Sequence, residues 1–356
     1  MQYIYPIRLE ASLHETLWGG RRLERDGWKR LPQANVAIGE AWETEISNVV
    51  QNGAHAGKTL GALVNELGPS LLGTQTLAIF GMRFPLLAKF IDANARLSVQ
   101  VHPDDNYASV HEGGKLGKTE FWYILATEPG ASIVHGFKAA TSRAEVERAI
   151  QDVTLEHLLH EENVQPGDVI FVPAGTVHAI GSGVLLYELQ EYSDITYRMY
   201  DYGRLTADGK PRELHIERSL DVARYAPSQR IKVNPVALSS EPGYEERCLV
   251  ACRYFVTREL RLKEYRTLAA ATGSSCVILT CLQGTPVVWY PGTDEPGLKG
   301  DFRRYASEKL ASGQTMILPA ALGRYIIEGP GTVLRSYVPE AADEAWQLWR
   351  TENNEA

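Results

Sequence analysis

The chain has 356 residues, of which 44% are hydrophobic and 22% are charged, and its formal net charge at pH 7 is −8. This composition is typical of a globular protein that buries a substantial core, either in two or three domains or in one large elaborated domain. The acidic balance argues against a protein that binds the nucleic-acid backbone, and no apolar run is long enough to span a membrane.

In chain order, the first residues are MQYIYPIRLE, which lack the basic and apolar regions of a signal peptide, so we expect a cytoplasmic protein. Leucines at helical spacing predict a helix within 58–73. Ser142 and Glu145 form a capping-box pattern that predicts a helix over 142–163, and a short helix is expected within 339–356. Short apolar runs between many glycines and prolines predict a mainly β protein, with strands at 84–91, 97–102, 120–126, 168–174, 183–190, 253–260, 275–282, 285–290 and 314–320.

The predicted strand LSVQVH, residues 97–102, carries an unusual row of polar side chains. Leu97 and the two valines point to one face, so Ser98, Gln100 and His102 share the other face. Burying a hydroxyl, an amide and an imidazole side by side is unfavourable unless they share a partner. Taken singly, each has an ordinary interpretation as a hydrogen-bonded polar residue, but the row as a whole indicates a binding site.

Two later segments supply further metal-binding groups. GKTEFWYIL places Glu120 at the head of a strand, with Lys118 on the same face, and GDVIFVPAGTVHAIG contains His178. The spacing of Gly, Pro, Gly and His in the second segment is the second motif of the cupin barrels, in which the histidine points inward. A divalent metal inside a barrel needs several such ligands on converging strands, so we predict a site made by Gln100, His102, Glu120 and His178.

A second polar cluster lies in YELQEYSDITYRMYDYGR. Glu188 and Gln190 share a face, and so do Asp194 and Arg198. An arginine inside a barrel is costly unless it meets an anion. Two interpretations stay open: Arg198 pairs with Asp194, or it meets an anionic substrate or a developing oxyanion.

A weak internal repeat indicates two barrels. Residues 167–181 align with GQTMILPAALGRYII, residues 313–327, so that His178 falls opposite Arg324. Residues 225–246 are rich in Pro and Ser, and we place a boundary there. We therefore predict a metal-binding barrel at 1–230, with a helical insert near 142–163, and a barrel without metal at 231–356. The cysteines form no C-x-x-C pair and are expected to be buried free thiols: Cys248, Cys252, Cys276 and Cys281.

The motifs GEAWE, SVQVHPDD, GKTE and PAGTVHAI, together with the segment around Arg198, resemble the class I mannose-6-phosphate isomerases, and most closely their short bacterial branch. The likeness covers most of the chain and is strongest from Ile38 to Arg204. It implies a double cupin fold and an enzyme that interconverts mannose 6-phosphate and fructose 6-phosphate through a cis-enediol. It also implies one Zn²⁺ per chain, held by the predicted ligands, with Gln100 ranked below the other three.

The resemblance further implies roles for other residues. Lys118 and Arg198 match active-site cations, and Glu188 and Asp194 match acidic residues of the same region. The proton-transfer base stays open between Glu188, Asp194 and a metal-bound hydroxide. The positions associated with the substrate phosphate correspond to Ser98 and Arg204, although SDITYRMYDYGR departs from the pattern of the long form at the second of them. A small hexose phosphate is the expected partner, and a monomer or weak homodimer is the expected state.

Three alternatives remain at this point. A metal cupin can be an iron or manganese oxygenase, although those usually begin with His-x-His rather than the Gln-x-His found here. The barrel can also serve as a non-catalytic sugar-phosphate-binding protein, which would be expected to lose a ligand or Arg198. The third alternative is an isomerase of a related sugar or phosphosugar.

Overall fold

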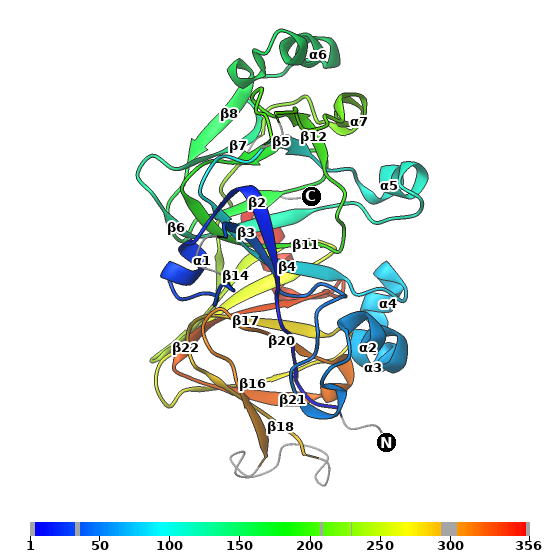
Figure 1. Ribbon diagram of the computed structural model, residues 1–356. Coiled ribbons are helices and arrows are strands. Elements are labelled where there is room, and N and C mark those ends of the chain that lie inside the picture. Colours follow the sequence, from blue (N-terminus) through cyan, green and yellow to red (C-terminus); the bar gives the residue numbers. More distant parts are fainter. Residues whose placement is uncertain (1–3, 33–35, 207–208, 229, 293–304, 354–356) are drawn as a thin grey trace.

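The computed structural model describes residues 4–32, 36–206, 209–228, 230–292 and 305–353. In this part of the chain the strands form antiparallel sheets that face one another in two pairs, one above the other in Figure 1. We call the upper pair the first barrel and the lower pair the second barrel. The mainly β, double-barrel fold predicted from the sequence is confirmed.

The first barrel is made of sheets N1 and N2. Sheet N1 has the order β2 (Ser12–Gly20), β3 (Ile38–Trp42), β4 (Leu86–Ala93), β11 (Val184–Glu191), β6 (Glu120–Thr127) and β9 (Val169–Val172). Sheet N2 has the order β12 (Tyr197–Tyr200), β5 (Val99–Val101), β10 (His178–Ile180), β7 (Ser132–Phe137) and β8 (Leu159–Asn163).

The second barrel is made of sheets C1 and C2. Sheet C1 has the order β13 (Val236–Glu241), β14 (Tyr244–Ala251), β15 (Val256–Leu262), β22 (Gly331–Tyr337), β17 (Val277–Gly284), β20 (Thr315–Leu318) and β1 (Ile7–Arg8). Sheet C2 has the order β16 (Thr267–Ala271), β21 (Arg324–Glu328), β18 (Val287–Tyr290) and β19 (Ala306–Lys309). The division near residue 230 stays a prediction, and β1 crosses it, because this N-terminal strand pairs with β20.

The two barrels repeat one strand order. In N1 the run β4-β11-β6-β9 corresponds to β15-β22-β17-β20 in C1, and in N2 the run β5-β10-β7-β8 corresponds to β16-β21-β18-β19 in C2. The repeated sequence segments therefore occupy equivalent places, β9–β10 in one barrel and β20–β21 in the other. The weak sequence repeat reflects a repeated structure.

The helices lie outside the barrels. They are α1 (Arg22–Arg25), α2 (Leu60–Leu67), α3 (Pro69–Leu72), α4 (Thr74–Phe80), α5 (Asp105–His111), α6 (Arg143–Gln151), α7 (Ile216–Val222) and α8 (Glu344–Asn353), with short 3-10 turns η1 (Gly53–His55), η2 (Leu155–His157) and η4 (Ala320–Leu322). Figure 1 shows α6 and α7 at the top of the first barrel and α2, α3 and α4 beside the second. None of the helices in the described ranges is both long and apolar enough to cross a membrane.

One predicted helix is shorter than expected. The capping box of Ser142 and Glu145 is present and starts α6, but the helix ends at Gln151. Residues 159–163 instead form β8, which pairs with β7. Pairing with a neighbouring strand overrides local helix propensity in this segment, as tertiary context commonly does. The predicted helix at 58–73 is present as α2 and α3, and the C-terminal helix as α8.

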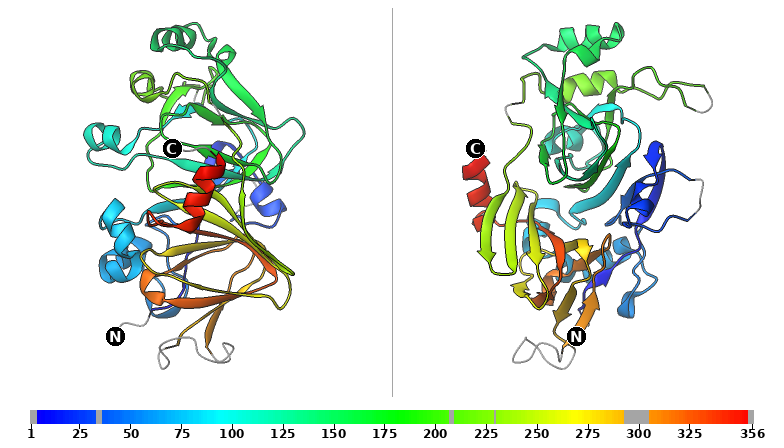
Figure 2. Two further views of the ribbon diagram at one scale, coloured as in Figure 1. Left: turned by 180° about the vertical axis from the view of Figure 1, so that it is seen from behind. Right: turned by 90° about the vertical axis from the view of Figure 1, so that its left-hand side faces the viewer.

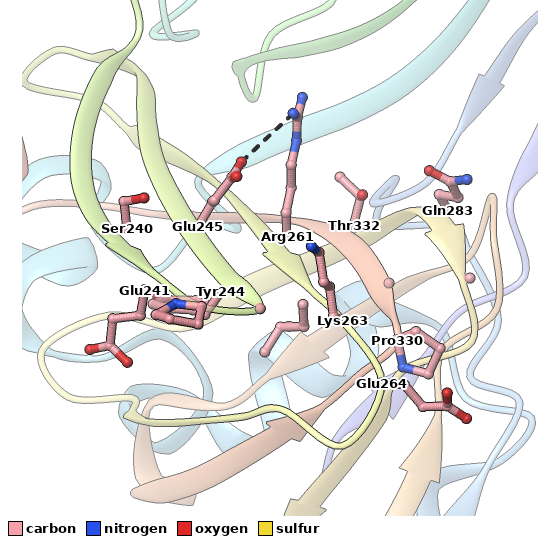
Figure 3. Close-up of a pocket in the computed structure, with 15 residues that line it drawn as sticks. Ser240, Glu241, Tyr244, Glu245, Arg261, Lys263, Glu264, Gln283, Pro330 and Thr332 are labelled. Atoms are coloured by element: carbon pink, nitrogen blue, oxygen red, sulfur yellow. Dashed lines mark ion pairs between the residues drawn. The ribbon is translucent and has the colours of Figure 1, made fainter.

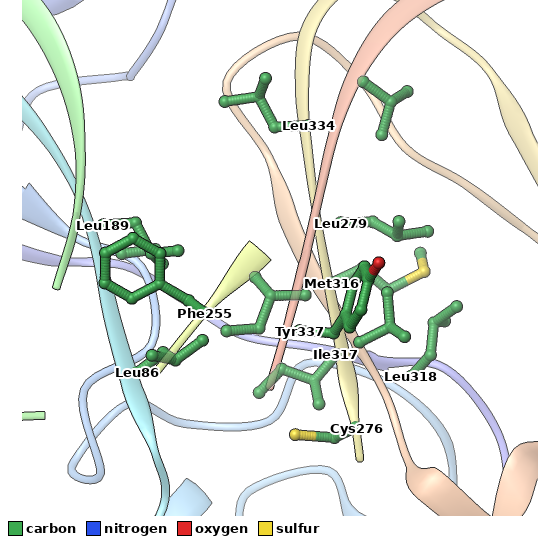
Figure 4. Close-up of a cluster of buried hydrophobic side chains, with 14 of the residues drawn as sticks. Leu86, Leu189, Phe255, Cys276, Leu279, Met316, Ile317, Leu318, Leu334 and Tyr337 are labelled. Atoms are coloured by element: carbon green, nitrogen blue, oxygen red, sulfur yellow. The ribbon is translucent and has the colours of Figure 1, made fainter. Parts of the chain in front are cut away.

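The two barrels share one hydrophobic core between sheets N1 and C1. Phe121 of β6 meets Phe255 with ring centroids 5.9 Å apart, and Leu86 and Leu189 lie beside Phe255 in Figure 4. Helix α8, seen from behind in Figure 2, adds Trp349, whose indole Nε1–H donates to the carbonyl oxygen of Leu249 at 3.0 Å. Cys248, Cys276 and Cys281 are buried free thiols, and Cys252 is only partly buried.

A polar contact also joins the barrels. The Tyr123 hydroxyl of β6 donates to Glu259 Oε1 of β15 at 2.7 Å, and Glu259 is only 1% exposed. The guanidinium groups of Arg247 and Arg261 lie against the same carboxylate. A buried charge that accepts these hydrogen bonds fixes the registration of N1 on C1.

Changing Tyr123→Phe should lower the free energy of unfolding by about 1.5–3 kcal/mol, because the hydroxyl donates to a buried charged group. Chemical denaturation followed by circular dichroism measures the change. Tyr265→Phe is the matched control, since Tyr265 is 79% exposed, and it should shift stability by less than about 0.5 kcal/mol. Equal effects of the two substitutions would contradict this account of the interface.

Candidate metal centre and active site

The inner faces of the first barrel carry two rows of polar side chains. In N2, strand register places Arg198, Gln100, His178 and His135 in one row across β12, β5, β10 and β7. Paired residues in a sheet share a face, so these side chains point to the same side. Further along the barrel the inner faces become apolar and form a cluster that includes Ile124, Ile180 and Leu186.

The facing sheet N1 supplies a second row. Its register aligns Trp42, Lys89, Glu188 and Trp122 across β3, β4, β11 and β6. Glu120 lies two residues before Trp122 in β6, so its side chain is on the same face of the sheet. These side chains are buried apart from Trp42, which is partly buried. The sheet pair thus collects charged groups at one end of an otherwise apolar barrel.

Three of the predicted ligands converge at this end. His102 Nε2 lies 3.7 Å from Glu120 Oε2, and His178 Nε2 lies 3.4 Å from Glu120 Oε1. The ligand atoms of His102, Glu120 and His178 all lie within 4.8 Å of one another. All three residues are at most 1% exposed. Two imidazoles and a carboxylate at this spacing can hold one divalent metal ion.

Backbone carbonyls orient both imidazoles. His102 Nδ1 lies 2.8 Å from the carbonyl oxygen of Ile195, and His178 Nδ1 lies 2.8 Å from that of Thr176. A carbonyl only accepts, so each Nδ1 carries the proton and each Nε2 presents a lone pair. Neither Nε2 has a hydrogen-bond partner among the described residues, and the same holds for Glu120 Oε1. Such orphaned buried atoms fit a metal that completes the site.

His135 shows the contrast with the two ligand histidines. It is the cross-strand neighbour of His178, but its Nδ1 lies 2.9 Å from Ser228 Oγ and its Nε2 lies 2.9 Å from the Phe171 carbonyl oxygen. Both ring nitrogens are therefore occupied by protein partners. Neighbouring position alone does not make a ligand; a free ring nitrogen is also required.

Burial sets the protonation states of the three groups. It raises the pKa of Glu120 to about 7, with the Glu188 carboxylate adding to the rise, while Lys118 at 2.9 Å and Lys89 oppose it. Burial lowers the pKa of His178 to about 3 and places the pKa of His102 well below its ordinary range. At neutral pH both imidazoles are thus neutral, the form that binds metal.

Lys89 is a site residue that the sequence reasoning missed. Its Nζ lies 3.2 Å from Glu188 Oε1, 3.7 Å from a Glu40 oxygen, and 4.6 Å from the ring centroid of Trp42. Burial alone would lower the pKa of Lys89, but the two carboxylates outweigh it and raise that pKa, so the amine stays charged. A lysine inside the apolar run FPLLAKFI was the available signal, because a buried charge needs a partner.

Glu188 is held as a carboxylate. Burial would raise the pKa of Glu188, but Lys89 and Lys118 outweigh it, so the pKa lies below its ordinary value. The Trp122 indole Nε1–H also donates to Glu188 Oε2 at 3.0 Å. The two glutamates of the site therefore differ: the environment raises the pKa of Glu120 and lowers that of Glu188.

Of the two interpretations left open for Arg198, the structure contradicts the pairing with Asp194. Asp194 has a side chain 66% exposed, and its Oδ1 lies 2.9 Å from Lys115 Nζ. It precedes β12 rather than lying in a continuous strand with Arg198, so the assumed alternation of side chains does not apply. Arg198 instead donates from Nη1 to the Glu213 carbonyl oxygen at 2.8 Å, and its buried Nε has no hydrogen-bond partner among the described residues.

The other predicted residues lie around Arg198. Gln100 is half-buried between His178 and Arg198 in register, and Ser98 is buried two residues before it. Arg204 donates from Nε to Asp201 Oδ1 at 3.2 Å. Burial lowers the pKa of Arg198, and the charges of Arg212 and Arg204 lower it further. This side of the row is thus rich in guanidinium groups.

The equivalent positions in the second barrel carry no such ligand set. The register of Ala271 with Arg324 corresponds to that of Gln100 with His178. Gly273 then stands at the place of His102, and Val277, paired with Leu318, at the place of Glu120. Arg324 is exposed. That the second barrel binds no metal stays a prediction.

Comparison with known proteins identifies relatives that all carry the same enzyme name. Residues 7–117 match the family model described as the catalytic domain of type I phosphomannose isomerase. The chain is 35% identical over 343 residues to mannose-6-phosphate isomerase ManA of Bacillus subtilis (strain 168), covering 94% of this chain and 99% of that protein. It is 34% identical over 339 residues to mannose-6-phosphate isomerase of Streptococcus mutans, covering 94% and 99%.

A solved structure is also similar. The crystal structure of the mannose 6-phosphate isomerase from Bacillus subtilis superposes with a TM-score of 0.78 at 32% identity, covering 93% of this chain and 99% of that chain. The likeness therefore extends over both barrels and is not confined to the metal-binding one.

The raised pKa of Glu120 predicts how metal affinity depends on pH. In the metal-free protein the Glu120 carboxyl is protonated below about pH 7, and a divalent metal must displace that proton. Zinc affinity should therefore fall about tenfold per pH unit below pH 7 and level off above it. Competition with a chelator between pH 5.5 and 8 measures this. In Glu120→Gln the slope should vanish at a lower affinity; an unchanged slope would show that another group holds the proton.

Proposed function

The chain belongs to the type I phosphomannose isomerase family, and from this premise we propose that it is a mannose-6-phosphate isomerase whose reaction takes place at the polar end of the first barrel. The observation that carries this proposal is the convergence of His102, Glu120 and His178 with their free ligand atoms facing one another. The reaction moves a proton between C1 and C2 of the open-chain sugar phosphate.

The proposed metal is Zn²⁺, one per chain. Two neutral imidazoles and one carboxylate are a common zinc ligand set that leaves a position open for substrate. Gln100 is the candidate for a further, weaker ligand, because it lies beside His178 in register. When bound, the ion would supply a Lewis acid that polarises the sugar carbonyl and its neighbouring hydroxyl.

We assign the proton transfer to Glu188. Its carboxylate is buried in the row that faces His178 and is kept ionised by Lys89 and Lys118, so it can accept a proton and return it. Asp194, the other acidic candidate from the sequence, is exposed and paired with Lys115, and we drop it from the catalytic set. Lys118 keeps its proposed role as a cation beside Glu120 that opposes negative charge in the site.

Arg198 is proposed to stabilise the negative charge of the enediolate. It shares the inner face with Gln100 and His178, and its buried Nε lacks a hydrogen-bond partner among the described residues. A preorganised donor of this kind lowers the energy of the transition state more than that of the substrate. Ser98 and Arg204, on the same side, are the proposed contacts of the substrate phosphate.

The overall charge of the site suits a phosphate ester. Lys89, Lys118 and Arg198 offset Glu40, Glu120 and Glu188, and the imidazoles are neutral, so a divalent metal would leave the site positive. A hexose phosphate dianion then balances that charge. A cytoplasmic location and a monomeric or weakly dimeric state stay predictions from the sequence.

Chelation of the protein should abolish isomerisation of mannose 6-phosphate, and Zn²⁺ should restore it. His178→Ala should lower zinc content and reduce kcat/KM by more than the roughly 10–100-fold that loss of an outer partner costs. His160→Ala, on the partly exposed part of β8, is the matched control and should keep both near wild type. Stoichiometric zinc in a folded His178→Ala protein would refute the ligand assignment. The same assay with mannose tests whether the phosphate is required.

Arg198→Lys keeps the charge but loses the planar fork of donors. If Arg198 stabilises the enediolate, kcat should fall by roughly 10²–10³, KM should change less, and zinc content should stay constant. Asp194→Asn serves as the comparison, and its kcat should remain within about twofold of wild type because the side chain is exposed. A folded, zinc-loaded Arg198→Lys enzyme with normal kcat would end the catalytic assignment.

A further inference from the structure

A cavity lies next to the candidate metal centre and is not used by the proposed reaction. Its volume is about 480 Å³, which is large enough for a small metabolite. It is lined by the ends of β7 and β9, by Thr176, by Asn353 of α8, and by Arg224, Ala226, Pro227, Ser228, Arg230 and Val233.

The cavity has an unusual charge for this protein. Arg224 and Arg230 line it, and no Asp or Glu is among the described residues that do. The chain as a whole carries 44 acidic against 36 basic residues, so an all-positive lining is not what its composition favours. The cavity of Figure 3, on sheet C1, shows the contrast: there Arg261 and Lys263 are accompanied by Glu241, Glu245 and Glu264, and Arg261 pairs with Glu245.

Neither arginine is neutralised by a carboxylate within the described part of the chain. Arg230 donates from Nη1 to Asn353 Oδ1 at 3.0 Å and to the Glu352 carbonyl oxygen at 3.3 Å, both neutral acceptors. Arg224 lies across Gly175: a Cβ at that glycine would come within 3.0 Å of Arg224 Cγ. The Thr176 hydroxyl adds a donor beside these two cations, whereas the Ser228 hydroxyl donates to His135 Nδ1.

Two glycines let the segment around Arg224 pass close to the barrel. Gly175 has φ +85°, and its carbonyl oxygen accepts from the Arg224 N–H at 2.8 Å. Gly136 has φ +72°, and a Cβ there would come within 2.4 Å of Ser228 Oγ. Any larger residue at either position would displace the segment that carries the arginines. The cavity is thus a feature of the backbone as well as of its side chains.

The wall of this cavity also holds the metal ligands. The Gly175 N–H donates to the His102 carbonyl oxygen at 2.8 Å, and the Thr176 carbonyl oxygen accepts from His178 Nδ1. His135, which lines the cavity, is the cross-strand neighbour of His178. In sheet N2, His135 lies on one side of His178 and Arg198 on the other, so the cavity beside His135 is separated from Arg198 by β5 and β10.

We propose that this cavity is a second anion site, which binds a phosphate group through Arg224 and Arg230. Guanidinium groups with a neighbouring hydroxyl donor match the chemistry of phosphate oxygens. Because its wall positions His102 and His178, occupancy changes kcat rather than competing with substrate. The effect on kcat rests on the proposed isomerase activity, whereas the binding of phosphate does not. Inorganic phosphate and a sugar phosphate both present the phosphate oxygens that this site would bind, so both are candidate ligands.

Calorimetric titration of the zinc-loaded protein with inorganic phosphate tests the binding. We expect one phosphate-binding event per chain that is lost or at least tenfold weaker in Arg224→Gln/Arg230→Gln, whether or not a further phosphate binds at the metal centre. Ala226→Glu, which adds a negative charge to the exposed lining, should have the same effect without removing either arginine's contacts. The matched controls Arg324→Gln and Ala321→Glu, at exposed sites on the second barrel, should bind as wild type does. Identical isotherms for wild type, Ala226→Glu and the double variant would overturn the proposal.

Kinetics test the coupling. At saturating mannose 6-phosphate, inorganic phosphate should still change kcat of wild type and should leave kcat of the double variant unchanged. Purely competitive inhibition in both proteins would overturn the coupling. A repeat titration with glucose 6-phosphate identifies the source: tighter binding than inorganic phosphate assigns a sugar phosphate, and equal binding assigns free phosphate. A wild type with no isomerase activity would remove the proposed function but leave the binding result standing.

Discussion

The burial of two imidazoles and one carboxylate at the end of an apolar barrel is the constraint on which the rest depends. His102, Glu120 and His178 are almost fully buried, and the Nε2 atoms of both histidines and Glu120 Oε1 have no hydrogen-bond partner in the described part of the chain. Such a group is unfavourable alone and favourable around a divalent cation. The surrounding backbone orients the two imidazoles. The carbonyl oxygens of Ile195 and Thr176 accept from Nδ1 of His102 and of His178, which leaves both Nε2 atoms available to a metal.

The second barrel keeps the architecture without the site. Its strand order repeats that of the first, yet Gly273, Val277 and Arg324 stand where the ligands would be. Its contribution is to packing: sheet C1 covers the outer face of N1, and Glu259 accepts from Tyr123 across the interface. Sheet N1 thus has the candidate site residues on one face and a buried apolar contact on the other, which holds β4, β6 and β11 in place.

Much of this site was predictable because it follows strand alternation. Gln100 and His102 are two residues apart, and Glu120 and His178 begin strands, so their common inner face could be inferred from sequence. Glu40 and Lys89 could not be placed in this way, because their partners come from other strands and only register brings them together. Asp194 was misplaced for the opposite reason: alternation was extended beyond the start of β12. The helix expected to 163 likewise ended early, because β8 pairs with β7.

The most direct test of the central claim is X-ray absorption spectroscopy of the zinc-loaded protein. The account predicts two imidazole nitrogens at about 2.0–2.1 Å, oxygen ligands at about 2.0–2.2 Å, and no sulfur. In a folded His178→Ala protein reloaded with zinc, the imidazole signal should fall from two rings to one. A sulfur ligand at about 2.3 Å, or an unchanged imidazole count in that variant, would place the metal elsewhere and contradict the account.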